Sequence, residues 1–266
     1  MVKKIIAQSY VWLILLLLYM PIMFVIAFSF TRSSTIGQWN GFSLELYSIL
    51  FKNAKLMEAV KNTFVIAFLA SSVATALGSI AAIGIYYSRP RVKTAMLTVS
   101  QVPVVNADIV TAVSLSLLFL SLGVGKGFTT LLISHITFCT PYVVLSVLPK
   151  LKQMNPSMYE AALDLGATPG RALWKVVLPE IVPGMVSGFL LSFTLSVDDF
   201  VVTVYNTMGY DTLSKYIYDN ASKAGIGPEL RALSAIIFIF TLTVLLVYNI
   251  TSLKKQGIKN TVALPK

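Results

Sequence analysis

The chain has 266 residues, of which 56% are hydrophobic and only 12% are charged, and its formal net charge is +10. Soluble globular domains carry about 25% charged residues, so this composition excludes a soluble enzyme, a disordered chain and a nucleic-acid-binding module. A single cysteine, Cys139, excludes a disulfide framework and a cysteine-based zinc site. The sequence therefore indicates an integral membrane protein.

Long, continuous apolar stretches predict that this membrane protein is all-α. A helix needs about 20 apolar residues to cross the hydrocarbon core. Six stretches qualify, at about 10–30, 62–86, 96–121, 130–149, 181–205 and 233–252. The first follows Lys3 and Lys4 and is too long for a signal peptide, so we expect an uncleaved anchor. The expected domains are the anchor with its outer loop (1–61), a core of five membrane helices (62–253) and a tail (254–266).

Basic residues predict the orientation of these spans. With the N-terminus inside, the inner segments hold 13 Lys and Arg residues and the outer segments hold 8. Because cytoplasmic loops are enriched in Lys and Arg, we expect both termini to be cytoplasmic.

The first outer segment and the second span carry two packing signals. Residues 43–60 predict an amphipathic stretch outside the membrane. The second span then places Ala70, Ala74, Gly78 and Ala82 four residues apart, and small residues allow close helix approach. Packing within the bundle and a subunit interface both explain this spacing.

The third and fourth spans contain polar residues at membrane depth. Pro103, Asn106 and Asp108 interrupt the third span. Such an interruption is tolerated where a span is buried in protein or lines water. The fourth span contains His135, the only histidine, for which we expect a hydrogen bond between helices.

The inner segment 150–180 predicts two short helices. Ser157 and Glu160 fit a capping box that starts a helix at 158–165, and Gly166 suits the left-handed position that ends it. A second helix, 169–178, would begin after Thr168 and be ended or bent by Pro179. The first helix either lies on the membrane surface or docks into a groove of a cytosolic partner.

Three carboxylates lie within spans: Asp108, Asp198 and Asp199. Each ionised aspartate costs about 2.5–3.5 kcal/mol at a helix centre, so they must face water, pair with a partner chain or bind a cation. Counted along straight helices at 1.5 Å per residue, Asp108 and Asp198 lie at similar depths, about 18 and 22 Å from the inner side. Successive helical residues differ by about 100°, so one of Asp198 and Asp199 can face a pore while the other caps a helix break or contacts a partner. Structural roles remain open for all three.

Several of these motifs resemble one protein family. Glu160-Ala161-Ala162, Gly166 and Leu178-Pro179 match the EAA…G…LP signature of permease subunits of ATP-binding-cassette (ABC) importers. The segments HITFCTPYVV at 135–144 and SFTLSVDDFVV at 192–202, with the six-span layout, resemble the permeases of spermidine/putrescine importers.

The resemblance implies a type I ABC importer fold in a bacterial inner membrane. It implies a coupling helix that docks onto an ATPase, with coupling residues Tyr159, Glu160, Ala161, Ala162 and Gly166. The expected partners are a homologous permease subunit in a heterodimer, a dimer of ATPase subunits, an extracytoplasmic polyamine-binding protein and the lipid bilayer, without nucleic acid. The chain would be a transport subunit and not an enzyme, with ATP and Mg²⁺ bound by the partner ATPase and no cofactor of its own.

A polyamine substrate gives the intramembrane acids a role. Spaced carboxylates can each accept charge-assisted hydrogen bonds from one ammonium, so we expect Asp108, Asp198 and Asp199, with the hydroxyl of Ser196, to line the substrate path. Two alternatives remain: a permease of the same fold for another small solute, and an unrelated membrane channel.

Overall fold

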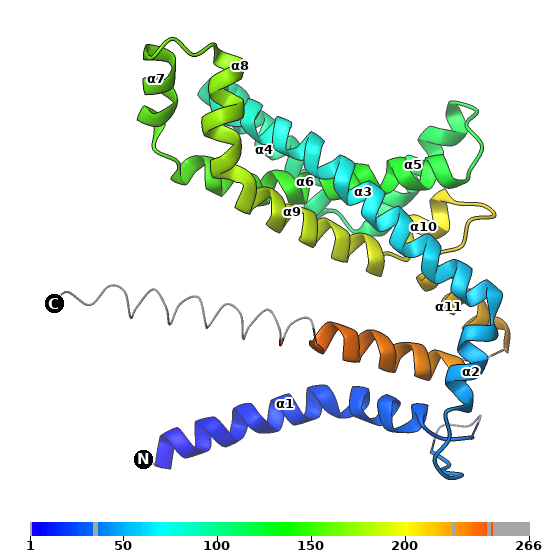
Figure 1. The fold of residues 1–266 in the computed structure, drawn as a ribbon. Coiled ribbons are helices and arrows are strands. Elements are labelled where there is room, and N and C mark those ends of the chain that lie inside the picture. Colours follow the sequence, from blue (N-terminus) through cyan, green and yellow to red (C-terminus); the bar gives the residue numbers. More distant parts are fainter. Residues whose placement is uncertain (1, 34–36, 225–226, 244–245, 247–266) are drawn as a thin grey trace. The chain divides into compact units, whose positions relative to one another are not determined.

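The computed structural model describes residues 2–33, 37–224, 227–243 and 246, all of them helical or in connecting segments. The chain divides into two compact units, Met1–Met57 with Asn220–Lys266, and Glu58–Asp219. Figure 1 shows the helices. Their bounds are α1 (Val2–Ser29), α2 (Glu45–Lys52), α3 (Ala54–Tyr87), α4 (Pro90–Val105), α5 (Asp108–Ser121), α6 (Phe128–Gln153), α7 (Pro156–Asp164), α8 (Pro169–Ala172), a π-helical turn η1 (Leu173–Val177), α9 (Leu178–Asp198), α10 (Val201–Asn206) and α11 (Leu213–Ala224).

Four helical stretches are long and apolar enough to cross a membrane within the described residues. They are Gln8–Ser29, Ala54–Tyr87, Phe128–Gln153 and Pro169–Asp198, and a fifth is possible if the bent pair α4 and α5 counts as one span. The predicted sixth span, 233–252, is described only in part, as a helix over 229–243. The predicted tail, 254–266, lies outside the described residues.

In the first unit, polar contacts tie the segment after residue 220 to the N-terminal part. The buried Arg231 donates hydrogen bonds to the carbonyl of Ser33 at 2.8 Å and to that of Phe28, near the end of α1, at 3.4 Å. The side-chain amide of Asn53 donates to Glu229 at 3.4 Å. These contacts join Arg231 to the end of α1 and Glu229 to the residue that precedes α3.

The predicted amphipathic stretch 43–60 is divided between α2 and the start of α3. α2 buries Leu46 and Leu50, and α3 begins directly after Asn53. The Oδ1 atom of Asn53 accepts the backbone N–H of Leu56 at 3.1 Å, which is the hydrogen bond of an N-cap. The capping residue therefore separates the outer helix from the long helix that follows it.

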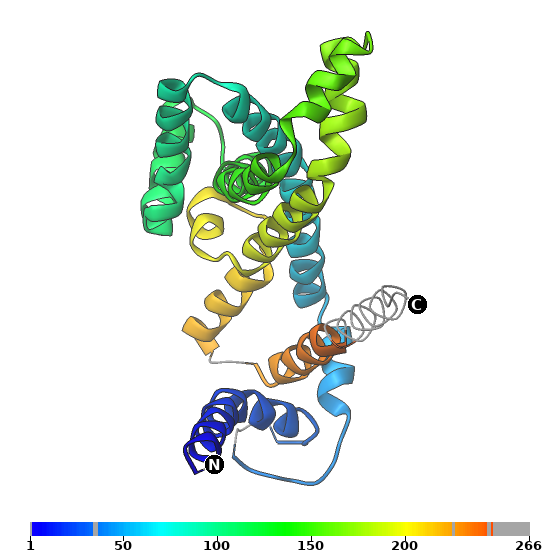
Figure 2. The same ribbon diagram turned by 90° about the vertical axis from the view of Figure 1, so that its left-hand side faces the viewer.

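In the second unit, α6 is the central helix, and Figure 2 shows it nearly end-on, beside α3 and α9. A Cβ atom at Gly78 of α3 would lie 2.7 Å from Cβ of Val143 in α6, and one at Gly188 of α9 would lie 3.2 Å from Cα of the same Val143. Ala70, Ala74 and Ala82 are fully buried. The small residues thus serve packing within this chain, the first of the two alternatives.

The expected third span, 96–121, is broken at the interruption that the sequence predicted. α4 and α5 meet at an angle of 103°, because Asn106 and Ala107 have extended backbone with ψ angles of 149° and 138°. A depth for Asp108 counted along one straight helix therefore does not apply. The chain bends at a polar residue that follows Pro103, where a helix loses one backbone donor.

The expected fifth span also ends early. α9 stops at Asp198, Asp199 has extended backbone with ψ 131°, and the chain resumes as the short helix α10. The buried Asn206 holds α10 in place. Its side-chain amide donates to the backbone carbonyl of Ala112 in α5 at 3.1 Å, and its backbone carbonyl accepts a hydrogen bond from the hydroxyl of Thr130 in α6 at 2.8 Å. Two broken helices therefore pack together beside α6.

Pro179 does not end the helix before it, although an end was the first of the two outcomes that the sequence left open. α8, η1 and α9 form one apolar helical stretch from Pro169 to Asp198. A proline ring clashes with the carbonyl four residues earlier, here that of Lys175. The π-helical turn Leu173–Val177 widens the backbone at this point, so the helix continues through the proline.

Candidate functional site

The break between α9 and α10 is held by a buried polar network around Asp199. Its Oδ1 accepts the backbone N–H of Val202 at 3.1 Å, and its Oδ2 accepts the backbone N–H and the hydroxyl of Thr203 at 2.8 and 2.9 Å. His135 of α6 places Nε2 3.5 Å from the same Oδ2. Asp199 thus caps α10, where a negative charge is favourable, and its side chain is only 9% exposed.

The hydrogen bonds fix the tautomer of the buried His135. The Thr203 hydroxyl donates to Asp199, so it accepts at 3.2 Å from Nε2, which therefore carries hydrogen. Nδ1 lies 2.7 Å from the hydroxyl of Ser196. His135 therefore links α6 to α9 and α10 by hydrogen bonds. A hydrogen bond between helices is what the sequence predicted for this residue.

The four residues predicted for the substrate path separate into two pairs. Ser196 and Asp199 belong to the buried network. Asp198 and Asp108 are exposed, the first at the last position of α9 and the second at the first position of α5. Neither forms an ion pair within the described part of the chain. The two exposed carboxylates lie at the two places where membrane helices break.

Sequence reasoning missed Thr203 and Asn206, although both are fully buried and essential to this geometry. The available signal was their spacing. Thr203 lies four residues after Asp199, within reach of a capping carboxylate, and Asn206 is an amide at the end of an apolar run. A buried amide requires partners, so these two residues indicated a second helix end next to Asp199.

The EAA motif lies on α7, at the end of the bundle where α3 and α6 finish. The predicted capping box is wrong: the side chain of Asn155 accepts the N–H of Ser157 at 3.1 Å, and Pro156 is the first helical residue. Proline is favoured at this position because the N–H that it lacks would have no helical partner. The helix therefore starts two residues before the expected 158.

The end of α7 forms as predicted, at Gly166. Its φ is +84°, its N–H donates to Leu163 at 2.9 Å, and the N–H of Ala167 donates to Ala162 at 3.0 Å. These two bonds define a Schellman motif. Thr168 and Pro169 then take the N-cap and first positions of α8, although the Thr168 side chain forms no capping bond.

The side chains of α7 divide between two faces. Tyr159 packs inward, with its ring centroid 5.5 Å from that of Tyr87, and joins the core around α6. Glu160, Ala161 and Leu165 are exposed, Leu165 by 89%. Trp174 of η1 is also exposed, by 74%. An exposed apolar and acidic strip of this kind fits contact with another protein.

We expect Gly166→Ala to weaken the turn after α7 by about 1–2 kcal/mol, because a left-handed backbone is unfavourable for a residue with a Cβ atom. Nothing lies within 4 Å of that Cβ, so the cost is conformational and not steric. The backbone amides of residues 166 and 167 should exchange hydrogen faster in the variant, and hydrogen-exchange measurements on both proteins test this.

The matched control for this turn is Gly170→Ala in α8. Its Cβ would also meet nothing within 4 Å, and its φ is not positive. Alanine there favours the helix by about 0.5–1 kcal/mol. Equal exchange rates in the two variants would contradict the proposed role of the left-handed backbone.

At the other end of the second unit, charge and burial shape the start of α11 and the loop before it. Lys215 forms ion pairs with Asp211 and with Asp219, the latter at 3.3 Å. Burial lowers the pKa of Lys215, but the two carboxylates outweigh it and hold the pKa above its ordinary value. The loop is attached to α3 by Thr63, whose hydroxyl accepts the N–H of Leu213 at 2.7 Å.

Broken membrane helices around polar residues are typical of helical membrane transport proteins. Residues 74–253 match the family described as the binding-protein-dependent transport system inner membrane component. Because this match covers more than half of the chain, the protein belongs to that family and is an inner-membrane permease and transport subunit. The family expected from the EAA motif is thereby confirmed.

Curated relatives support the same assignment. The chain is 36% identical to the spermidine/putrescine transport system permease protein PotC of Haemophilus influenzae, over 94% of this chain and 97% of the relative. It is 38% identical to PotC of Escherichia coli K12, over 92% and 93%. The putrescine transport system permease protein PotI of Escherichia coli K12 is 35% identical, over 83% and 81%.

Solved structures share the fold. A bacterial ABC transporter involved in the import of the acidic polysaccharide alginate has a chain that matches with a TM-score of 0.73 at 14% identity, over 94% of this chain and 95% of that one. An amino acid ABC transporter matches with a TM-score of 0.58 at 19% identity, over 79% and 98%. These likenesses establish the ABC importer permease fold and say nothing about the solute.

Proposed function

We propose that the protein is the permease subunit of an ABC importer for polyamines, spermidine and putrescine. It would span the membrane six times with both termini in the cytoplasm. The named relatives at 35–38% identity support this substrate class. The single observation that carries the proposal is the exposed Asp198 at a helix break that buried contacts hold in place.

The network around Asp199 gives the exposed acid its position. Asp199 and His135 hold the start of α10, and Ser196 holds His135, so the carboxylate of Asp198 projects from a rigid helix end. In this proposal Asp198 and Asp108 accept hydrogen bonds from the ammonium groups of the substrate, whereas Asp199 and Ser196 position the break. The apolar stretches 62–86, 96–121, 130–149 and 181–205 contain no lysine or arginine to attract an anion, which favours a cation.

The partners follow from the same proposal. α7, with Glu160, Ala161 and Gly166 exposed and Tyr159 and Ala162 turned inward, would be the coupling helix that docks onto a dimer of ATPase subunits. Those subunits would bind ATP and Mg²⁺. A homologous permease would complete the translocation path as a heterodimer, and an extracytoplasmic binding protein would deliver the polyamine.

We expect Asp198→Asn to lower ATP-driven uptake of radiolabelled putrescine and spermidine at least ten-fold in membrane vesicles. Hydrogen bonds to a charged group contribute about 1.5–3 kcal/mol, and the amide keeps the size but loses the charge. Co-purification with the ATPase should be unchanged.

Asp219→Asn in α11 is the control, since it removes the same charge outside the predicted path. Normal uptake by Asp198→Asn would remove this residue from the path. Lack of polyamine uptake by the unaltered importer would overturn the substrate class and favour another small solute.

A further inference from the structure

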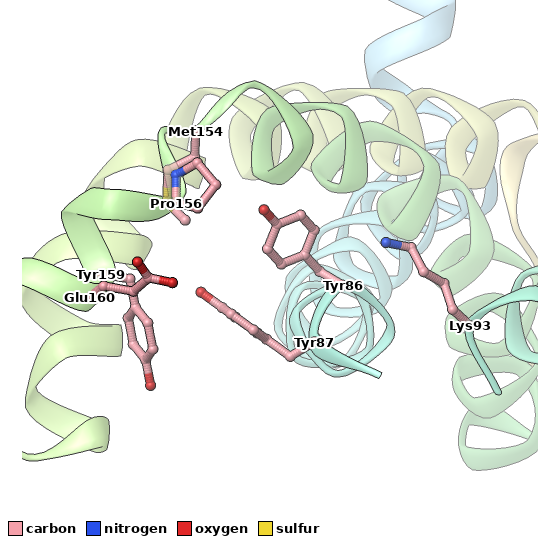
Figure 3. A pocket seen from close by; sticks show the side chains of 7 residues that line it. All are labelled: Tyr86, Tyr87, Lys93, Met154, Pro156, Tyr159 and Glu160. Atoms are coloured by element: carbon pink, nitrogen blue, oxygen red, sulfur yellow. The ribbon is translucent and has the colours of Figure 1, made fainter. Parts of the chain in front are cut away.

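A cavity of about 420 Å³ lies beside α7 and the start of α4. Figure 3 shows its lining, which comes from the end of α3, the start of α4, the end of α6 and α7 itself. The lining residues are Tyr86, Tyr87, Lys93, Met154, Pro156, Tyr159 and Glu160. The lining therefore combines three tyrosines, one carboxylate and one lysine.

The oxygen atoms of this cavity converge. In Figure 3 the hydroxyls of Tyr86 and Tyr87 and the carboxylate of Glu160 point toward a shared space. The rings form the walls: Tyr86 and Tyr87 are perpendicular with centroids 4.9 Å apart, and Tyr159 stands 5.5 Å from Tyr87. The site therefore offers oxygen acceptors, a negative charge and aromatic faces together.

This combination matches a primary ammonium group. An ammonium has three hydrogens to donate and no acceptor, and it is attracted to the face of an aromatic ring. On the inner side of Tyr86 an anion would be repelled by Glu160, and a neutral solute would gain nothing from its charge; Lys93, the basic residue of the lining, lies on the other side of Tyr86. The exposure of Tyr87, 47%, leaves the site open to solvent.

The protein itself supplies an example of the contact. The ammonium of Lys93 lies 5.1 Å from the ring centroid of Tyr86, and Figure 3 shows it approaching that ring from the side away from Glu160. One ring of the cavity thus already holds an alkylammonium on its outer side. The inner side, with Glu160 and Tyr87, is available for a second one.

We propose that this cavity binds the primary ammonium end of an alkylamine on the cytoplasmic side. That the natural ligand is an imported polyamine rests on the proposed function, whereas the preference for an alkylammonium does not. Because Tyr159 and Glu160 belong to α7, an occupied cavity would engage the helix proposed to contact the ATPase. Accumulated polyamine would then slow its own import.

Equilibrium binding of radiolabelled putrescine to the complete importer in nanodiscs tests the site. Unlabelled n-butylamine should displace the label, whereas n-butanol, which has the same chain without the charge, should not. Tyr87→Leu should weaken the butylamine-sensitive binding at least five-fold, both alone and with Asp198→Asn. Tyr10→Leu, at an exposed tyrosine of α1, should have no effect.

Unchanged binding in Tyr87→Leu, or displacement by n-butanol as efficient as by n-butylamine, would overturn the proposal. A second measurement compares the rate of ATP hydrolysis with and without putrescine on the ATPase side and gives the ratio of the two rates for each variant. Putrescine should lower the rate in the unaltered importer, and Tyr87→Leu should reduce that fall. If polyamine uptake is absent but n-butylamine still binds through Tyr87, only the proposed function fails. If uptake is normal and binding is independent of Tyr87, only this site fails.

Discussion

Replacement of Asp199 by alanine should destabilise the second unit by about 3 kcal/mol or more. The carboxylate accepts the N–H groups of Val202 and Thr203 and the Thr203 hydroxyl, and each buried donor left without a partner costs about 1–3 kcal/mol. His135, fully buried, would lose its acidic neighbour at the same time. The thermal midpoint of the purified importer complex measures the loss, and hydrogen exchange at Val202 and Thr203 locates it.

The neighbouring Asp198→Ala is the matched control for this prediction. Its carboxylate is exposed and forms no ion pair within the described residues, so the thermal midpoint should stay within the error of the measurement while polyamine uptake falls. The two adjacent aspartates would then have different roles: loss of Asp199 lowers stability, and loss of Asp198 lowers transport. Equal midpoints for Asp199→Ala and Asp198→Ala would contradict the capping role.

Gly78→Leu should prevent α3 from packing on α6. Even a single Cβ atom at residue 78 would lie 2.7 Å from Cβ of Val143 and 3.0 Å from the carbonyl oxygen of Thr140. Overpacking usually costs about 1–3 kcal/mol, and a whole leucine against backbone belongs at or above the upper end of that range. The yield of monodisperse complex in detergent and its thermal midpoint both report the change.

Gly84→Leu, six residues further along the same helix, distinguishes packing from helix propensity. Its Cβ would meet nothing within 4 Å, so leucine there should leave the midpoint unchanged or raise it slightly. A drop of similar size in both variants would show that the substitution acts through the helix and not through the contact with α6.

The sequence predicted the parts of this fold that local chemistry controls. Apolar length located α1, α3 and α6, and glycine at residue 166 predicted the left-handed end of α7, because few other residues adopt that backbone. Small-residue spacing marked the face of α3 that meets α6. These features depend on residues that are close together in the sequence, so the sequence pattern predicts them.

The breaks in the membrane helices depended on distant partners and were harder to predict. Proline gave opposite outcomes: the helix continues through Pro179 by means of a π-helical turn, whereas it stops soon after Pro103. For Asp198 and Asp199, periodicity showed that the two could not share one direction. Only the positions of His135 and Thr203 on other helices decide which aspartate is buried.

The uninterrupted helix from Pro169 to Asp198 has a mechanical consequence. Its 30 residues make a rod of about 45 Å at 1.5 Å per residue, with the turn after α7 at one end and the exposed acid at the other. A push along this rod displaces both ends equally. The extra residue of the π-helical turn also sets the angle between them, so deleting one residue within Leu173–Val177 would rotate one end by about 100° against the other.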